Sequence, residues 1–223
     1  QYITREAWFY GLRFEVNENT LLPRPETEEL VEWIIESQKS KVKSQKFEIL
    51  DIGTGTGCIP ISLKANLPHV NVSAIDVSEK ALEVARRNAV SNKVEINFIQ
   101  TNILEVEDLS QLQTPNFQLP TSFDIIVSNP PYVRNLEKEE IKKNVLDYEP
   151  HLALFVEDTD ALLFYRKIAQ LALKNLAPNG LLFFEINQYL GKETVELLKN
   201  LGLKNIELKK DIYGNDRMVK STR

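Results

Sequence analysis

The sequence holds few of the residues that build disulfides and metal centres. Among its 223 residues are one cysteine, Cys58, and two histidines, His69 and His151, which lie far apart in the chain. A lone cysteine excludes an internal disulfide, and without a cluster of cysteine and histidine the usual zinc ligands are missing. No apolar run reaches the roughly 18 residues of a membrane helix, and no secretory signal is visible. We therefore expect a cytoplasmic protein that binds no metal and enters no membrane.

Positive charge is also scarce. The 27 Lys and Arg residues are outnumbered by 32 Asp and Glu, which gives a formal net charge of −5. Nucleic-acid binders usually carry a basic face, so we expect no direct nucleic-acid binding. The basic run at residues 39–46 is most simply a solvated linker between a helix and a strand, and the polar residues 105–122 are interpreted as a surface excursion.

The chain is rich in alternating strands and helices from Phe47 onward. We expect strands at residues 47–52, 70–75, 94–100, 123–127 and 181–186. Helices are expected at 59–66, at 79–91 with Ser78 as N-cap, at 160–176, and at 191–201 with Gly202 as C-cap. Such an alternation is typical of βαβ units, and hence of a mainly parallel sheet with helices on both faces. Two closing strands, 203–209 and 217–221, should form an antiparallel hairpin at one edge. Together they predict an α/β fold with a seven-stranded sheet.

The N-terminal segment does not follow this alternation. Residues 6–17 predict a hairpin around Gly11. A helix with a buried stripe should start at Pro25, which suits the first turn of a helix. We therefore divide the chain into an N-terminal hairpin and helix, residues 1–45, and a larger α/β domain, residues 46–223.

A glycine-rich loop follows the first strand of that domain. Three alternating glycines let the backbone approach a ligand without Cβ clashes, and the next helix points free N–H groups at it. A dinucleotide fingerprint reads G-x-G-x-x-G, but here the third glycine comes one residue early. Asp51, just before the loop, would oppose a pyrophosphate and suits the ammonium of S-adenosylmethionine. The loop residues expected to bind that cofactor are Gly53, Thr54, Gly55, Thr56 and Gly57.

Two more polar residues should reach the same edge of the sheet, because parallel strands bring their carboxyl ends together there. Asp76 ends the second strand and is placed to accept both ribose hydroxyls. Asn102 follows the third strand and could meet the amino edge of adenine, with Ile103 packed on the ring. For Asn102, an ordinary surface loop is the competing interpretation.

The segment Ser128-Asn129-Pro130-Pro131-Tyr132 follows the fourth strand. Its prolines remove two N–H donors and fix φ at both positions, so the backbone cannot continue a central ladder. What remains is a stiff turn with free carbonyl groups, preceded by the side-chain amide of Asn129 and followed by the phenol ring of Tyr132. We interpret it as the holder of a flat group with N–H donors, an amino group to be modified; the alternative is a rigid surface turn. Residues 136–144 should form a charged helix over this site.

The loop, Asp76 and the Asn129–Tyr132 segment resemble the class I S-adenosylmethionine-dependent methyltransferases, which have a Rossmann-like fold. Asn-Pro-Pro-Tyr narrows the resemblance to enzymes that methylate amino groups. Four blocks in order along the chain look like the peptide chain release factor N5-glutamine methyltransferases (HemK/PrmC type). These blocks are residues 22–28, 123–132, 149–154 and 211–217.

The resemblance implies methyl transfer from S-adenosylmethionine to the glutamine of the Gly-Gly-Gln motif of a release factor. It places Ile103 against the adenine, and Arg24 and Thr27 near the cofactor at the mouth of the site. The residues that would hold the glutamine are Asn129, Pro130, Pro131 and Tyr132. The product would be S-adenosylhomocysteine, the partner a release factor, and the enzyme a monomer. The alternatives are a ribosomal-protein glutamine methyltransferase, an adenine N6 or cytosine N4 methyltransferase, and a module without activity.

In the expected mechanism, the Asn129 side-chain oxygen and the Pro130 carbonyl each accept one N–H of the substrate amide, and Tyr132 packs on its plane. No histidine or carboxylate is recognised beside the motif, and none is needed as a base before transfer. The sequence also departs from the family. We expect the upstream helical domain of the family to be absent here. Asn102 stands where an acid is frequent, and Asn187 stands where a glycine is usual.

Overall fold

The computed structural model describes residues 4–38, 47–115, 117–140 and 143–223. The predicted linker at residues 39–46 lies outside the described residues. The chain begins with an antiparallel hairpin of β1 (Glu6–Phe9) and β2 (Leu12–Glu15). It continues into α1 (Pro25–Gln38), which buries Leu30, Val31 and Ile34. The hairpin and the first helix are therefore confirmed.

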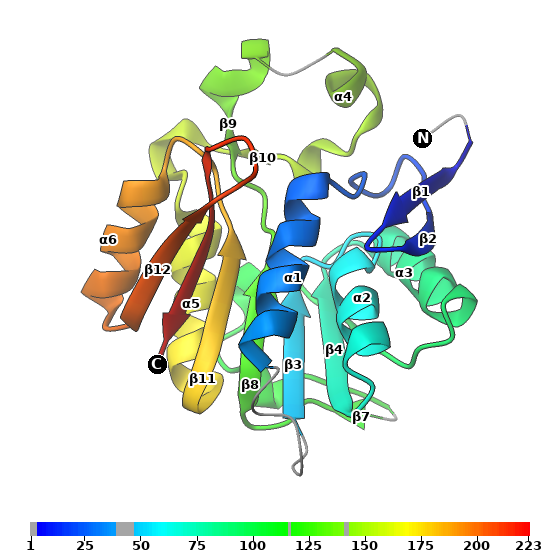
Figure 1. Ribbon diagram of the computed structural model, residues 1–223, viewed down its shortest axis with the longest axis horizontal. Helices are drawn as coiled ribbons and strands as arrows, with labels where there is room; N and C mark the ends of the chain where they lie inside the picture. The colour runs from blue at the N-terminus through cyan, green and yellow to red at the C-terminus, as the bar shows by residue number, and fades with distance from the viewer. Residues whose placement is uncertain (1–3, 39–46, 116, 141–142) are drawn as a thin grey trace.

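A seven-stranded sheet forms the centre of the molecule (Figure 1). In spatial order its strands are β12 (Lys204–Lys210), β13 (Asp216–Thr222), β11 (Leu176–Glu185), β8 (Phe123–Ser128), β3 (Phe47–Ile52), β4 (Val70–Asp76) and β5 (Asn97–Gln100). The pairs among β11, β8, β3, β4 and β5 are parallel. β13 runs antiparallel to both β11 and β12. The mainly parallel sheet with an antiparallel edge hairpin is confirmed.

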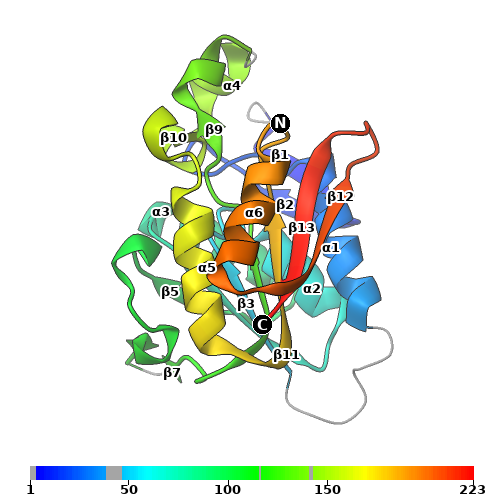
Figure 2. The same cartoon turned by 90° about the vertical axis from the view of Figure 1, so that its left-hand side faces the viewer.

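Helices cover both faces of the sheet, as the two views in Figures 1 and 2 show. α1, α2 (Cys58–Asn66) and α3 (Glu79–Ser91) share one apolar core with the odd-numbered side of β3 and β8. α5 (Leu163–Asn175) and α6 (Gly191–Leu201) enclose a second core on the other face. Because α1 shares the first core with the sheet, it is packed as part of the α/β unit. The division of the chain at residues 45 and 46 stays a prediction.

The excursion at residues 105–122 is less exposed than expected. Its short elements are η1 (Ile103–Glu105), η2 (Leu109–Gln111), β6 (Gln113–Thr114) and β7 (Phe117–Gln118). Val106, Leu109 and Leu119 are buried in the core beside α5. The interpretation as a surface excursion is therefore wrong for these three side chains. The segment is polar on average, but these apolar residues pack into the core.

The charged helix expected at residues 136–144 is α-helical only in part. The structure has a 3₁₀ helix, η3 (Asn135–Glu140), and the helix α4 (Lys143–Tyr148); residues 141 and 142 lie outside the described residues. Between β8 and α5 it also has β9 (Val133–Arg134), η4 (His151–Ala153), β10 (Phe155–Val156) and η5 (Asp158–Asp160). β9 and β10 pair in parallel. This segment stands above the carboxyl ends of the central strands in both views.

Two strands begin three or more residues from their predicted starts. β5 begins at Asn97 rather than at residue 94, and β11 begins at Leu176, where the long helix was expected to end. α6 spans the predicted residues and closes on Gly202 in a left-handed conformation, as expected of a helix C-cap. Among the described residues, no helix combines the length and the apolar character needed to cross a membrane.

Candidate active site

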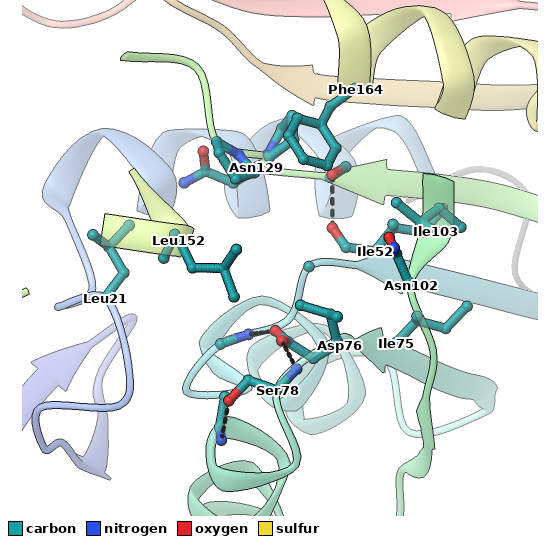
Figure 3. A pocket seen from close by; sticks show the side chains of 18 of the residues that line it. Leu21, Ile52, Ile75, Asp76, Ser78, Asn102, Ile103, Asn129, Leu152 and Phe164 are labelled. Atoms are coloured by element: carbon teal, nitrogen blue, oxygen red, sulfur yellow. Dashed lines mark hydrogen bonds between the residues drawn. The ribbon is translucent and has the colours of Figure 1, made fainter. Parts of the chain in front are cut away.

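A cavity of about 280 Å³ opens at the carboxyl ends of β3, β4, β5 and β8. Figure 3 shows Asn129 on one side of it and Asp76 with Ser78 on the opposite side. Leu21 and Leu152 lie at one end, and Asn102 and Ile103 at the other. The predicted site residues that line the cavity are Gly53, Gly55, Asp76, Asn102, Ile103, Asn129, Pro130 and Pro131. The predicted site residues that do not line the cavity are Arg24, Thr27, Thr54, Thr56, Gly57 and Tyr132.

Gly55 and Gly57 of the loop have different structural roles. Gly55 has φ +54 and open space where a Cβ would stand, so its backbone is accessible to a ligand. Gly57 has φ +80, and a Cβ there would lie 2.9 Å from Cδ1 of Ile61 and 3.1 Å from Cβ of Ala85. Gly57 therefore lets α2 and α3 approach each other, and its contact with a cofactor stays a prediction.

Asp76 joins the glycine loop to the start of α3. Its Oδ2 accepts the Gly55 N–H at 2.8 Å, and its Oδ1 accepts the Ser78 N–H at 2.9 Å. Burial raises the pKa of Asp76, and the backbone donors oppose that rise. Each carboxylate oxygen has a second lone pair, so Asp76 can still accept hydroxyl groups from a ligand in the cavity.

Asn102 reaches the cavity with its amide already engaged. Its side-chain oxygen accepts the Leu104 N–H at 3.2 Å, and its nitrogen donates to Oε1 of Glu105 at 2.8 Å. It therefore caps the short helix η1. Ile103 is buried beside it and contributes an apolar surface to the cavity. The contact of Asn102 with an adenine stays a prediction.

Asp51 lies under the loop on β3, where its side chain is fully buried. Among the described residues, none donates a hydrogen bond to either of its carboxylate oxygens. Burial raises the pKa of Asp51 to about 7, and only the nearby Thr54 hydroxyl, which falls short of hydrogen-bond geometry, opposes the rise. Asp51 is absent from the cavity lining, and its place beside a ligand ammonium stays a prediction.

A hydrogen-bonded network lies behind Asn129. The Asn129 Nδ2 donates to the Thr27 hydroxyl in a long bond of 3.5 Å. The Thr27 hydroxyl donates to Oε2 of Glu185 at 2.6 Å, and the Tyr132 hydroxyl donates to Oε1 at 3.0 Å. Ser128, one residue earlier, donates its hydroxyl to the Ile52 carbonyl at 2.6 Å and ties β8 to β3.

Glu185 is the site residue that the sequence analysis missed. It ends β11 with a side chain 1% exposed. Burial raises its pKa, while the Thr27 hydroxyl and the Arg217 charge oppose the rise. The expectation that no carboxylate stands beside the Asn-Pro-Pro-Tyr segment is therefore wrong. The signal was present, because an acid ends this apolar strand in the same way as Asp76 ends β4.

Tyr132 is turned toward Glu185. Its hydroxyl donates a hydrogen bond to that carboxylate, and its main-chain oxygen accepts a hydrogen bond from the Asn187 Nδ2 at 2.9 Å. Burial and the Glu185 charge raise the pKa of Tyr132. The ring packs against the core on the α5 side. Stacking of this ring on a substrate amide stays a prediction.

Arg24 connects two of the sequence blocks. Its guanidinium forms an ion pair with Glu149, whose side chain is 1% exposed. The second oxygen of Glu149 accepts the Leu22 N–H at 3.4 Å. The neighbouring Pro150 lines the cavity. The blocks 22–28 and 149–154 therefore meet beside the cavity, although more than a hundred residues separate them in sequence.

Comparison with known proteins agrees with this geometry. A family model described as Methyltransferase small domain matches residues 34–151. A relative from Flavobacterium psychrophilum, named Release factor glutamine methyltransferase, is 66% identical over 220 residues, which are 99% of this chain and 74% of the relative. A relative of the same name from Bacteroides thetaiotaomicron is 44% identical over 223 residues, which are 100% of this chain and 75% of the relative. The chain belongs to the release factor glutamine methyltransferase family.

The fold comparison reaches beyond this family. A methyltransferase structure from Pyrococcus furiosus has a TM-score of 0.62 at 19% identity, and the match covers 95% of this chain and 89% of that chain. The class I methyltransferase fold inferred from the sequence is thus confirmed. The resemblance to release factor glutamine methyltransferases is confirmed by the family membership.

The cavity fits the cofactor that this methyltransferase family implies, S-adenosylmethionine. The open backbone at Gly55 admits an amino-acid group, and Asp76 offers acceptors for a ribose diol. Ile75 and Ile103 give an apolar surface for a purine, with Phe164 across the cavity. Among the described residues, no three His, Cys, Asp or Glu side chains gather as a metal site would require.

Proposed function

We propose that this chain transfers a methyl group from S-adenosylmethionine to the side-chain amide nitrogen of the glutamine in the Gly-Gly-Gln motif of peptide chain release factors. The names of its relatives at 66% and 44% identity support this substrate. The observation that carries the chemistry is the placement of Asn129 and Pro130 at the wall of the cavity that also exposes Gly55 and Asp76. The partner is a release factor, and the enzyme works as a monomer in the cytoplasm.

For this reaction the protein must position the substrate amide nitrogen, which is a poor nucleophile. An amide nitrogen shares its lone pair with its carbonyl group, so it is planar and weakly nucleophilic. S-adenosylmethionine, when bound, supplies a methyl group on a sulfonium with a neutral leaving group. The Asn129 side-chain oxygen and the Pro130 carbonyl each accept one N–H of the substrate amide, which fixes the nitrogen opposite the methyl group. Holding reactants in line at roughly 3–3.5 Å supplies several kcal/mol of the barrier.

The proton balance needs no strong base. The nitrogen gains a methyl group and, because an N-protonated amide is very acidic, it gives one proton to water. Glu185, although close to the motif, accepts from Thr27 and Tyr132 and stands behind the cavity lining. Its task is therefore separate from proton removal.

The direct test is methyl transfer to a release factor, followed by mass spectrometry of the Gly-Gly-Gln peptide. We expect one added methyl group on the glutamine, and none when that glutamine is replaced. Asn129→Ala should lower transfer by at least about 100-fold, because the amide loses its positioning, and calorimetry should still detect S-adenosylmethionine binding. Asn71→Ala, which removes an exposed amide on β4, is the matched control. Methylation of a ribosomal protein or a nucleic acid in place of the release factor would reject the proposed substrate.

A further inference from the structure

Three segments distant in sequence meet behind the amide of Asn129. Thr27 comes from the first turn of α1, Asn129 from the end of β8 and Glu185 from the end of β11. Thr27 is 2% exposed and Glu185 is 1% exposed. Neither side chain lines the cavity. Any effect they have on a substrate must therefore pass through a neighbour that does.

The donor directions in this network decide how Asn129 is turned. The Thr27 hydroxyl donates its single proton to Oε2 of Glu185 at 2.6 Å. The Thr27 oxygen then has only lone pairs to offer, and Asn129 must present its NH₂ to it. The Asn129 carbonyl oxygen therefore points away from Thr27 and is free to accept. A flipped amide would set two oxygens against each other and lose the bond.

The carboxylate at the base of the network cannot turn freely. Tyr132 donates to its second oxygen at 3.0 Å, so each oxygen of Glu185 has its own donor. The Arg217 charge acts on the same carboxylate from the β13 side. With a donor on each oxygen, the Glu185 carboxylate keeps one orientation. Turning it would leave a buried polar group unpaired, which costs free energy.

We propose that Thr27 and Glu185 are positioning residues for methyl transfer, which orient the Asn129 side chain so that its oxygen accepts the substrate amide N–H. This inference rests on the proposed function. The Asn129–Thr27 bond measures 3.5 Å, and it shortens when the substrate draws on the Asn129 oxygen. The network thus fixes in advance which end of Asn129 meets the substrate.

The test uses substitutions that keep shape and remove single hydrogen bonds. Thr27→Val removes the hydroxyl and should lower kcat by about 10- to 100-fold, since a misoriented contact at the reacting group costs that much. The KM for S-adenosylmethionine should change less than about threefold, because Thr27 does not line the cavity. Thr27→Ser keeps the hydroxyl and should stay within about threefold of the wild type in kcat. Thr194→Val, which removes a buried hydroxyl on α6 bonded to the Leu190 carbonyl, is the matched control.

Glu185 offers a second pair of variants. In Glu185→Gln, the amide oxygen can still accept from Thr27, and the amide nitrogen can donate to the Tyr132 oxygen, so most of kcat should remain. Glu185→Ala leaves Thr27 without an acceptor and should resemble Thr27→Val in kcat. Loss of activity in both variants to the same degree would mean that the charge, and not the positioning, matters, and would overturn the proposal.

A measurement on the protein itself separates this inference from the proposed function. The side-chain NH₂ of Asn129 can be identified in ¹⁵N spectra by its loss in Asn129→Ala. Its hydrogen exchange should be slow in the wild type and faster by about 10-fold in Thr27→Val, where one hydrogen bond is lost. Unchanged exchange, or an unchanged kcat on a substrate that the wild type methylates, overturns the inference. A wild type that methylates no release factor overturns the proposed function, while the exchange still decides whether Thr27 holds Asn129.

Discussion

Asp51 offers a test of how strongly the interior of this fold opposes charge. The carboxyl group is fully buried on the central strand β3, with no donor to either oxygen among the described residues. Its pKa is about 7 in the folded chain, against the usual 3.8. The folded chain therefore keeps the proton over a range of pH in which the unfolded chain has lost it. Replacing Asp51 with asparagine removes this titration and keeps the shape of the side chain.

The size of the effect follows from that pKa difference. At about 1.4 kcal/mol per pKa unit, the difference amounts to about 4 kcal/mol. The folded chain binds the proton more tightly, so this contribution to stability is fully present below about pH 4 and is lost as pH rises through about 7. The amide of the variant has nothing to titrate and loses nothing. The free energy of unfolding of Asp51→Asn, relative to the wild type, should therefore rise by about 3 kcal/mol between pH 5 and pH 8.

Urea unfolding of both proteins at the two pH values measures this. Fluorescence of Trp33, which is buried and packs edge-on against Phe183, reports the transition. Glu83→Gln, at an exposed position on α3, removes the same charge and should leave the pH dependence of stability close to that of the wild type. Parallel pH profiles for Asp51→Asn and the wild type would show that burial does not govern this carboxyl group.

Two further predictions concern the loop and the helix after it. Gly57→Ala should lower the free energy of unfolding by about 1–3 kcal/mol more than Gly55→Ala, because both residues have positive φ and only the Gly57 Cβ would collide with its neighbours; equal losses in thermal or urea unfolding would contradict this. Cys58, which is 8% exposed and whose pKa is raised to about 12 by burial, should react with a thiol reagent only under denaturing conditions, and rapid labelling of the native enzyme would refute the buried placement.

The sequence was most informative where local chemistry decides the structure. Gly202 closes α6 because a left-handed residue is needed there. Ser78 caps α3 through its hydroxyl, which accepts the Ala81 N–H at 3.2 Å. The apolar runs predicted the core strands, and the strand ends placed Gly55, Asp76 and Asn129 around one cavity.

The rest depended on contacts between distant segments. The sequence pattern places Glu185 only within the strand predicted at residues 181–186, since nothing local shows that Thr27, 158 residues away, donates to it. The Tyr132 hydroxyl also donates to Glu185, which is distant in sequence. The Asn-Pro-Pro-Tyr motif alone does not show in which direction the tyrosine ring points. The pattern at residues 136–144 predicts one helix, but residues 135–140 form the 3₁₀ helix η3. There Glu137 accepts hydrogen bonds from the Arg134 N–H and from the Asn187 side-chain amide, each at 2.8 Å.

The order of these segments along the chain has a consequence for the timing of synthesis. The loop at Gly53–Gly57, Asp76 and Ile103 all leave the ribosome before Asn129, and Glu185 follows much later. The glycine loop and Asp76 are therefore made before the segments that complete the cavity, which include Asn129 and Phe164. Because β11 lies beside β8 in the sheet, Glu185 can reach Thr27 only after most of the chain has been made.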